Sequence, residues 1–373
     1  RNTPLRALRS GVYANSGDVK LAMNGDLTAA SDGGAGTGVY GVEADNNSVV
    51  EFSGAKALKA SANGGVAFGI SAYNGKVSGD LESITASSKL VDADGVRAIS
   101  GDVKLAMNGD LSATSEKAGA FGIDAWDNST VVFSGVKTLN ASSDQDSAAG
   151  INAYDSVVSG DLDNLNVDAA NGAATGIDIS SGKVSSIDIT NGLTVKGATG
   201  GVGIMASGAA HQITVGGLTD VSIASNGYSA VYAAGGANVN LNGGASLDVT
   251  GTGAVSGIAA NGGSVMVSGD KTVVKATTTG EGKTASAISS TGSGNVTINA
   301  GKDGVQLTAS AVSGDAAAVS GKGVVTIITP GQVSFDVTGR SARGLYSNGV
   351  FNSLVTADDG SNYKGTPTSG DAY

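Results

Sequence analysis

The feature that most limits how this chain can fold is an internal repeat. Residues 16–27 read SGDVKLAMNGDL, and the same twelve letters return at residues 100–111. Within this long repeat, a small residue, usually Gly, precedes an aliphatic anchor about every 28 residues. The thirteen anchors are Val12, Val42, Ile70, Ile99, Ile123, Ile151, Ile177, Ile204, Val231, Ile258, Ile288, Val319 and Leu345, with Val96 an almost equal choice for the fourth. Such a period is typical of solenoids, in which each repeat packs only against its neighbours.

Each repeat contains three short stretches in which apolar and polar residues alternate. Residues 150–153 (GINA), 129–135 (STVVFSG) and 139–142 (LNAS) are examples, and Gly, Asn or Asp residues separate such stretches. Alternation of this length between turn residues predicts strands, and three strands with their turns fill about 28 residues. We therefore predict an all-β fold, a right-handed parallel β-helix (β-solenoid) of about 13 coils of about 28 residues, the handedness following from the crossover rule.

The period also predicts the limits of the solenoid and the side chains of its core. We expect a lead-in over residues 1–10, the β-helix over 11–348 and a C-terminal tail or cap over 349–373. The anchors should form an inward column, repeated about every 4.8 Å along the axis. Three aromatic residues lie two positions before an anchor and are expected on the same inward face: Tyr40, Phe68 and Phe121.

Composition narrows the classes of function. The net charge is −11, with 22 Lys and Arg against 33 Asp and Glu, so nucleic acid is not an expected partner. There is no Cys, which excludes disulfides and thiolate metal sites. The 60 Gly residues suit a thin core whose corners require unusual backbone angles.

The repeat units resemble the passenger domains of bacterial type V autotransporters. The resemblance spans roughly residues 11–348 and rests on units such as 41–54 (GVEADNNSVVEFSG) and 262–269 (GGSVMVSG), together with the absence of Cys. It implies a right-handed β-helix exported across the outer membrane for adhesion, aggregation or biofilm formation. Members of the family carry a C-terminal translocator β-barrel, and no such strands are recognisable up to Tyr373. Either the barrel has been removed, or the chain is another secreted solenoid.

No residue pattern in the chain predicts catalysis, and we expect no catalytic residue, cofactor or metal site. His211 is the one His and is expected to be a turn residue between coils. Clustered carboxylates are the signature of polysaccharide-processing β-helix enzymes. The acidic pairs Asp92/Asp94, Asp144/Asp146 and Asp358/Asp359 lie in Ser-, Ala- and Gly-rich segments that predict solvated loops.

Three aromatic residues are the candidate contact site for a ligand or partner. Tyr73, Trp126 and Tyr154 each lie three residues after an aliphatic anchor, where the alternation predicts an outward side chain. They should form a stripe over four coils, interrupted at Asp102. Exposed aromatic faces beside Asp and Asn suit stacking on sugars or contact with proteins. The alternative is that they cover turns and contact nothing else.

The sequence thus predicts a secreted, non-catalytic β-helix passenger that mediates attachment or aggregation on the bacterial outer surface. Its expected partners are a host surface, extracellular matrix, a glycan or a like protein on a neighbouring cell. Contact with a membrane is expected only through a missing translocator domain. Two alternatives remain, a polysaccharide lyase or hydrolase and a spacer stalk.

Overall fold

The computed structural model describes residues 9–32, 38–225, 227–346, 352–356 and 361–367. The described residues form strands and turns and contain no helix. Two compact units divide the chain, residues 1–187 (unit 1) and 188–373 (unit 2). In each unit, strands from successive coils stack in parallel. The chain has about 12 turns in all and is a β-solenoid that matches the predicted right-handed β-helix.

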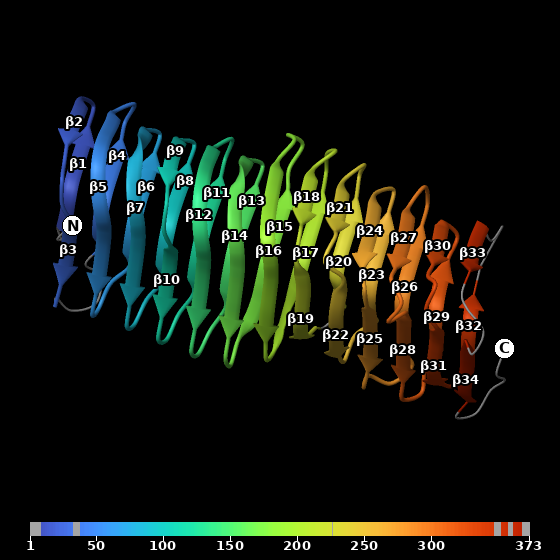
Figure 1. The fold of residues 1–373 in the computed structure, drawn as a ribbon. Coiled ribbons are helices and arrows are strands. Elements are labelled where there is room, and N and C mark those ends of the chain that lie inside the picture. Colours follow the sequence, from blue (N-terminus) through green and yellow to red (C-terminus); the bar gives the residue numbers. More distant parts are fainter. Residues whose placement is uncertain (1–8, 33–37, 226, 347–351, 357–360, 368–373) are drawn as a thin grey trace. The chain divides into compact units, whose positions relative to one another are not determined.

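One strand of every coil belongs to a sheet that we call the first sheet, and its strands lie side by side within each unit (Figure 1). In unit 1 these strands, in spatial order, are β1 (Arg9–Asn15), β4 (Val39–Asp45), β6 (Ala67–Tyr73), β8 (Ala93–Ile99), β11 (Ala120–Trp126), β13 (Ala148–Tyr154) and β15 (Ala173–Ser180). In unit 2 they are β17 (Gly200–Ser207), β20 (Ser229–Ala234), β23 (Val255–Asn261), β26 (Ala285–Thr291), β29 (Ala316–Gly321) and β32 (Ala342–Tyr346).

The rest of each coil forms the second sheet, either as two short strands or as one long, bent strand. In unit 1 its strands are β2 (Asp18–Ala22), β3 (Leu27–Ser31), β5 (Val49–Ala62), β7 (Lys76–Ser88), β9 (Asp102–Met107), β10 (Leu111–Ser115), β12 (Thr130–Ser143) and β14 (Val157–Ala169). In unit 2 they are β16 (Ser186–Gly197, which begins just before the division), β18 (Gln212–Val215), β19 (Leu218–Ala224), β21 (Asn238–Leu241), β22 (Ala245–Gly251), β24 (Ser264–Gly269), β25 (Thr272–Thr278), β27 (Asn295–Ala300), β28 (Val305–Ala311), β30 (Val324–Ile328), β31 (Val333–Gly339), β33 (Asn352–Thr356) and β34 (Asn362–Pro367). The last two pair with β30 and β31, inside the segment expected to be a tail or cap.

The corner after the first-sheet strands of unit 1 is a place where Asn and Asp residues set the backbone. Residues there adopt left-handed backbone angles without being Gly, as at Asn46 and Asn47 (φ 53° and 62°) and at Asp127 and Asn128 (φ 56° and 66°). Asn and Asp tolerate this conformation better than other residues with a side chain. The chain can therefore turn from the first sheet into the second at the same place in successive coils.

Buried serines hold another corner, between the second sheet and the next first-sheet strand. The Oγ atoms of Ser88, Ser115 and Ser143 donate to backbone carbonyls across the corner at 2.7–2.9 Å. The same atoms accept backbone N–H groups three residues later along the chain. Each Ser thus satisfies two backbone groups that the turn leaves without a ladder partner.

The core is built from columns of identical or similar side chains, as predicted. In unit 1 the anchors Ile70, Ile123 and Ile151 are fully buried, and in unit 2 Ile204 pairs in register with Val231. The anchor column of unit 2 continues through Ile258, Ile288 and Val319. Each such side chain contributes roughly 1.5–3 kcal/mol through burial.

The fourth anchor was assigned wrongly to Ile99. Val96 pairs in register with Ile70 and Ile123 and is fully buried, whereas Ile99 is half-buried three residues further on. In unit 1 the residue before each anchor is Gly, and a Cβ there would point into the core. At Gly95 that atom would lie 2.4 Å from Leu111 Cδ2. Val96 follows Gly95, and Ile99 follows Ala98.

The expectation that Tyr40, Phe68 and Phe121 point inward is also wrong. The Arg97 guanidinium, on the outer side of the first sheet, lies 5.2 Å from the centre of the Phe68 ring, and Tyr40 stacks on that ring at 5.0 Å. The alternation shifts because Gly69 has no register partner in the ladder, while both its missing Cβ and Ile70 face the core. Counting back from the anchor through this bulge therefore gives the wrong face.

Candidate functional site

The outer face of the first sheet in unit 1 carries three columns of side chains that point away from the core. Register pairing aligns them from coil to coil. The first column is Ser10, Tyr40, Phe68, Asp94, Phe121, Ala149 and Thr175. The second is Tyr13, Glu43, Ser71, Arg97, Asp124, Asn152 and Asp178. The third, beside the Asn corner, is Asn15, Asp45, Tyr73, Ile99, Trp126, Tyr154 and Ser180. We call these columns the outer face.

Trp126 and Tyr154 form an aromatic platform at one edge of the outer face. They are register partners in β11 and β13, and their ring centres lie 5.4 Å apart with the planes tilted by 38°. Trp126 is 36% exposed and Tyr154 49% exposed. Adjacent aromatic surfaces of this kind offer a large contact area to a ligand at little cost in conformational entropy.

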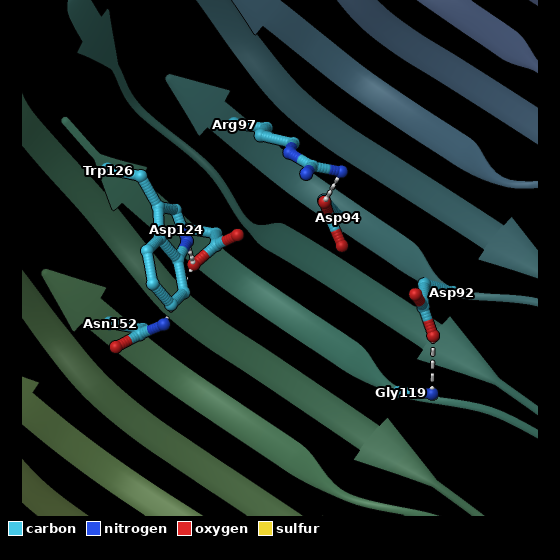
Figure 2. A network of polar contacts seen from close by, with 7 residues as sticks. All are labelled: Asp92, Asp94, Arg97, Gly119, Asp124, Trp126 and Asn152. Carbon is cyan, nitrogen blue, oxygen red and sulfur yellow. Dashed lines mark hydrogen bonds and ion pairs between the residues drawn. The ribbon is translucent and has the colours of Figure 1, made fainter. Parts of the chain in front are cut away.

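The carboxylate of Asp124 fixes the orientation of the Trp126 indole. Trp126 Nε1 donates to Asp124 Oδ1 at 2.5 Å, and Asn152 Nδ2 donates to the same oxygen at 2.8 Å. Figure 2 shows Asp124 between the indole and the Asn152 amide. The polar atom of the indole is therefore satisfied within the protein, and the exposed part of the ring is free for apolar contact.

Asp94 and Arg97, in the neighbouring strand β8, form an incompletely satisfied ion pair. Arg97 Nη1 lies 3.7 Å from Asp94 Oδ2 (Figure 2). Asp94 is only 2% exposed, since its register partners on either side are Phe68 and Phe121. Neither Asp94 Oδ1 nor Arg97 Nε has a hydrogen-bond partner. A buried acceptor without a donor costs roughly 1–3 kcal/mol, so this arrangement requires an explanation beyond the fold.

Burial raises the pKa of several carboxyl groups on the outer face. The pKa of Asp94 lies well above its ordinary value, first through burial and then through the charge of Asp124. Burial also raises the pKa of Asp124, against the effect of its bonds from Trp126 and Asn152. The pKa of Glu43 rises to about 7 and that of Asp178 to about 6, in both cases chiefly through burial.

The structure brings together two of the three aromatic residues that the sequence singled out. Tyr73 is 50% exposed and lies in the same column as Trp126 and Tyr154, but strand β8 separates it from them. The residue that interrupts the stripe is Ile99, and the predicted interruption at Asp102 is wrong, because Asp102 is the first residue of β9 in the second sheet. The error follows directly from the misplaced anchor.

The acidic pairs have different environments. Asp144 and Asp146 lie exposed in the loop between β12 and β13, as predicted. Asp94 contradicts the prediction of a solvated loop, because it lies buried within β8. Asp92 is half-buried and accepts the Gly119 N–H at 2.9 Å. Asp358 and Asp359 lie outside the described residues.

His211 lies between β17 and β18, where a turn residue was expected. It is fully buried, and its Nε2 is 3.0 Å from the carbonyl oxygen of Ser207. A buried ring held by the backbone of its own turn has a clear structural role.

Unit 2 has a smaller candidate on its own first sheet. A hollow of about 220 Å³ lies between Ser286, Asp315, Ser320 and Arg343. Its polar groups are already paired with one another or with neighbours: the two Ser Oγ atoms are 2.8 Å apart, and Arg340 Nη2 lies 3.0 Å from Asp315. It lacks the unsatisfied groups that distinguish the outer face of unit 1.

Among the described residues, no helix is long and apolar enough to cross a membrane, and no three acidic or His side chains are grouped as metal ligands. Comparisons of this chain with protein-family models, curated proteins and solved structures give no match.

Sequence reasoning missed Asp94, Asp124, Arg97 and Asn152 as members of this site. The signal that could have found them was the column alignment itself. With Val96 as anchor, Asp94 falls between Phe68 and Phe121, and Arg97 falls beside Asp124. The pairing of Trp126 Nε1 with Asp124, two residues earlier on the same face, also follows from that alignment.

Proposed function

We propose that this chain is a non-catalytic adhesive β-helix that binds its partner laterally, through the outer face of unit 1. The observation that carries the proposal is the Trp126–Tyr154 platform, two exposed rings 5.4 Å apart beside an acidic, hydrogen-bonding surface. Aromatic residues of this kind are frequent hot spots in contacts. A spacer stalk would have no need for an indole held by a carboxylate that Asn152 in turn holds in place.

The fold is compatible with the passenger of a type V autotransporter displayed on the bacterial outer surface. A stacked solenoid offers a long series of equivalent outward positions, which suits lateral attachment to a host surface, matrix, glycan or like protein. The role of Asp124 favours adhesion over the alternative of a polysaccharide lyase or hydrolase, because one of its oxygens already accepts hydrogen bonds from Trp126 and Asn152 and orients the platform.

The test is adhesion of beads coated with the purified chain to cells and to matrix preparations. The double substitution Trp126→Ala/Tyr154→Ala should reduce attachment about tenfold, because it removes the platform while leaving the core columns intact. Tyr228→Ala is the matched control, since Tyr228 is an exposed ring, 56% accessible, outside the platform. Undiminished attachment by a correctly folded double variant would refute lateral binding at this face.

A further inference from the structure

We propose that the platform and the Asp94–Arg97 pair together form a subsite for a neutral, hydroxyl-rich glycan. This proposal rests on the proposed adhesive function and adds the chemical class of the ligand. It is carried by three features of the outer face: the fixed platform, the charge of the columns around it, and the two unsatisfied polar atoms in the adjoining strand.

The platform is built to receive the apolar face of a sugar ring. Trp126 Nε1 donates to Asp124 Oδ1 at 2.5 Å, and Asn152 Nδ2 donates to the same oxygen at 2.8 Å. The plane of the Trp126 ring is therefore set before a ligand arrives. A ligand then loses little of its binding energy in ordering the site. Asp124 and Asn152 are therefore positioning residues for Trp126.

The charge of the outer face selects against anionic ligands. In the described strands of unit 1 its columns contain five carboxyl groups and one cation, Arg97. The carboxyl groups belong to Glu43, Asp45, Asp94, Asp124 and Asp178. Burial raises the pKa of these carboxyl groups, which lowers the negative charge that they carry near neutral pH. A polyuronate or a sulfated glycan would still find one cation among the columns, Arg97, which is already paired with Asp94. The carboxyl oxygens accept hydrogen bonds readily, and a neutral sugar has many hydroxyl donors.

The unsatisfied atoms match a hydroxyl better than they match a charged group. Asp94 Oδ1 lacks a donor and Arg97 Nε lacks an acceptor. A hydroxyl both donates and accepts, so the hydroxyls of a neutral sugar can donate to Asp94 Oδ1 and accept from Arg97 Nε. A carboxylate could satisfy only Arg97, and an ammonium group only Asp94. The side chain of Arg97 is 36% exposed and its 3.7 Å ion pair is long, so a change of its rotamer opens the way to Asp94.

A protein partner fits this face less well. Stable protein interfaces bury more than about 1,000 Å² and have an apolar centre. Here the two aromatic rings adjoin Asp124, Asn152 and Arg97, and Ile99 is the aliphatic neighbour in the same column. Two adjacent rings bordered by hydrogen-bonding groups offer a stacking surface with polar partners at its edge, which suits a glycan chain.

Trp126 is the one Trp in the chain, so its fluorescence reports on this subsite alone. The experiment titrates the full chain with neutral oligosaccharides (gluco-, manno- and galacto-series), with chitosan oligomers and with oligogalacturonates. We expect saturable quenching or a shift of the emission with at least one neutral series and none with oligogalacturonates. Saturation by chitosan oligomers alone, or by oligogalacturonates, would overturn the assignment to neutral glycans.

Three variants separate the parts of the proposal. Asp124→Ala and Asn152→Ala should lower the anisotropy of Trp126 emission and weaken binding about tenfold with an unchanged far-UV spectrum. Asp94→Ala copies the residue at the equivalent position of a later coil, Ala149. It should bind more weakly, yet melt at the same or a higher temperature than wild type, which a purely structural role for Asp94 would not produce. Unchanged affinity in all three would overturn the subsite.

Failure of the glycan assignment and failure of the adhesive site give different experimental results. If the Trp126→Ala/Tyr154→Ala variant loses cell attachment but wild type binds no neutral oligosaccharide in the titration, the platform is an adhesive site and the glycan assignment is wrong. If the double variant attaches normally, the adhesive site itself is wrong.

Discussion

At the scale of single residues, the outer face of unit 1 contains carboxyl groups that are buried although their side chains point away from the core. Glu43 is 5% exposed and accepts a hydrogen bond from Ser10 Oγ at 2.9 Å. Asp94 is more deeply buried and lacks a donor for one oxygen. Both carboxyl groups bind a proton more tightly in the folded chain than in the unfolded chain, which couples folding to pH.

The pH dependence of stability should reveal Glu43. Burial raises its pKa from 4.5 to about 7, so between these values the folded state binds more protons than the unfolded state. Stability is therefore full below about pH 4.5 and falls as the pH rises towards 7. Glu43→Gln should remove this part of the dependence and should raise the urea midpoint relative to wild type at pH 8.

Glu116→Gln is the matched control, because Glu116 is exposed. Urea titrations at pH 5 and pH 8 check the prediction. A wild-type midpoint that is higher at pH 8, or a Glu43→Gln variant that keeps the full difference between the two pH values, would contradict it.

At the scale of elements, the corners decide where one strand ends and the next begins. Consecutive left-handed residues follow β4 and β11, and single ones follow β6 and β13, at Asn74 and Asp155. Bends inside the long strands use Gly instead: Gly54 and Gly135 have φ of 67° and 68°, and a carboxylate from the next coil accepts each of their N–H groups at 2.9 Å. In unit 1 the choice between Asn or Asp and Gly therefore follows the position of the corner in the coil, whereas in unit 2 Gly235, Gly262 and Gly292 occupy the corner after the first-sheet strands.

Asn128 provides a test of this corner. It is exposed and has φ 66°, so Asn128→Ala should destabilise the chain by about 1–2 kcal/mol through backbone strain alone. Asn128→Gly should be close to wild type, because Gly adopts this conformation without strain. Urea unfolding of the two variants measures the difference, and equal midpoints would show that the left-handed backbone is not what Asn128 supplies.

At the scale of the whole molecule, parallel stacking replaces a conventional hydrophobic centre. Columns of Ala, Val, Ile and Leu fill the inside of each unit, and successive coils add the same small increment of burial.

The described residues contain no helix, so far-UV circular dichroism should show a β spectrum. A helical content near the third that is usual for globular proteins would contradict the solenoid.

The burial of the anchor column of unit 2 can be tested by introducing a charged side chain into it. Ile204 is fully buried beside Val231, so Ile204→Asp should cost several kcal/mol, because an isolated carboxylate must be neutralised or desolvated. Met205→Asp, at the half-exposed next position of β17, is the control and should cost much less. Thermal melting followed at a β wavelength compares them. A melting temperature of Ile204→Asp within a degree of wild type would show that this column does not face the core.

The fold class, the period and most of the anchor column could be predicted from the residues alone, because a repeated pattern of small and aliphatic residues leaves stacked parallel coils as the arrangement that buries the anchors. The sequence also placed Tyr73, Trp126 and Tyr154 outside the core, as their exposures confirm. It misjudged the faces of Tyr40, Phe68 and Phe121, because the bulge at Gly69 shifts an alternation that the letters alone present as regular. It also misplaced the fourth anchor, because Ala98–Ile99 and Gly95–Val96 both fit the pattern of a small residue before an aliphatic one.

Which outer residues contact one another could not be predicted from the repeat and depends on how the coils stack. Trp126 and Tyr154 became a platform while Tyr73 did not, since register is set by stacking between coils and β8 places Ile99 between them. The burial of Asp94 has the same origin: Phe68 and Phe121 are 26 and 27 residues away in the chain and become its direct neighbours through parallel pairing. Contacts made across coils depend on an exact register, and a period that varies by a few residues does not fix that register in advance.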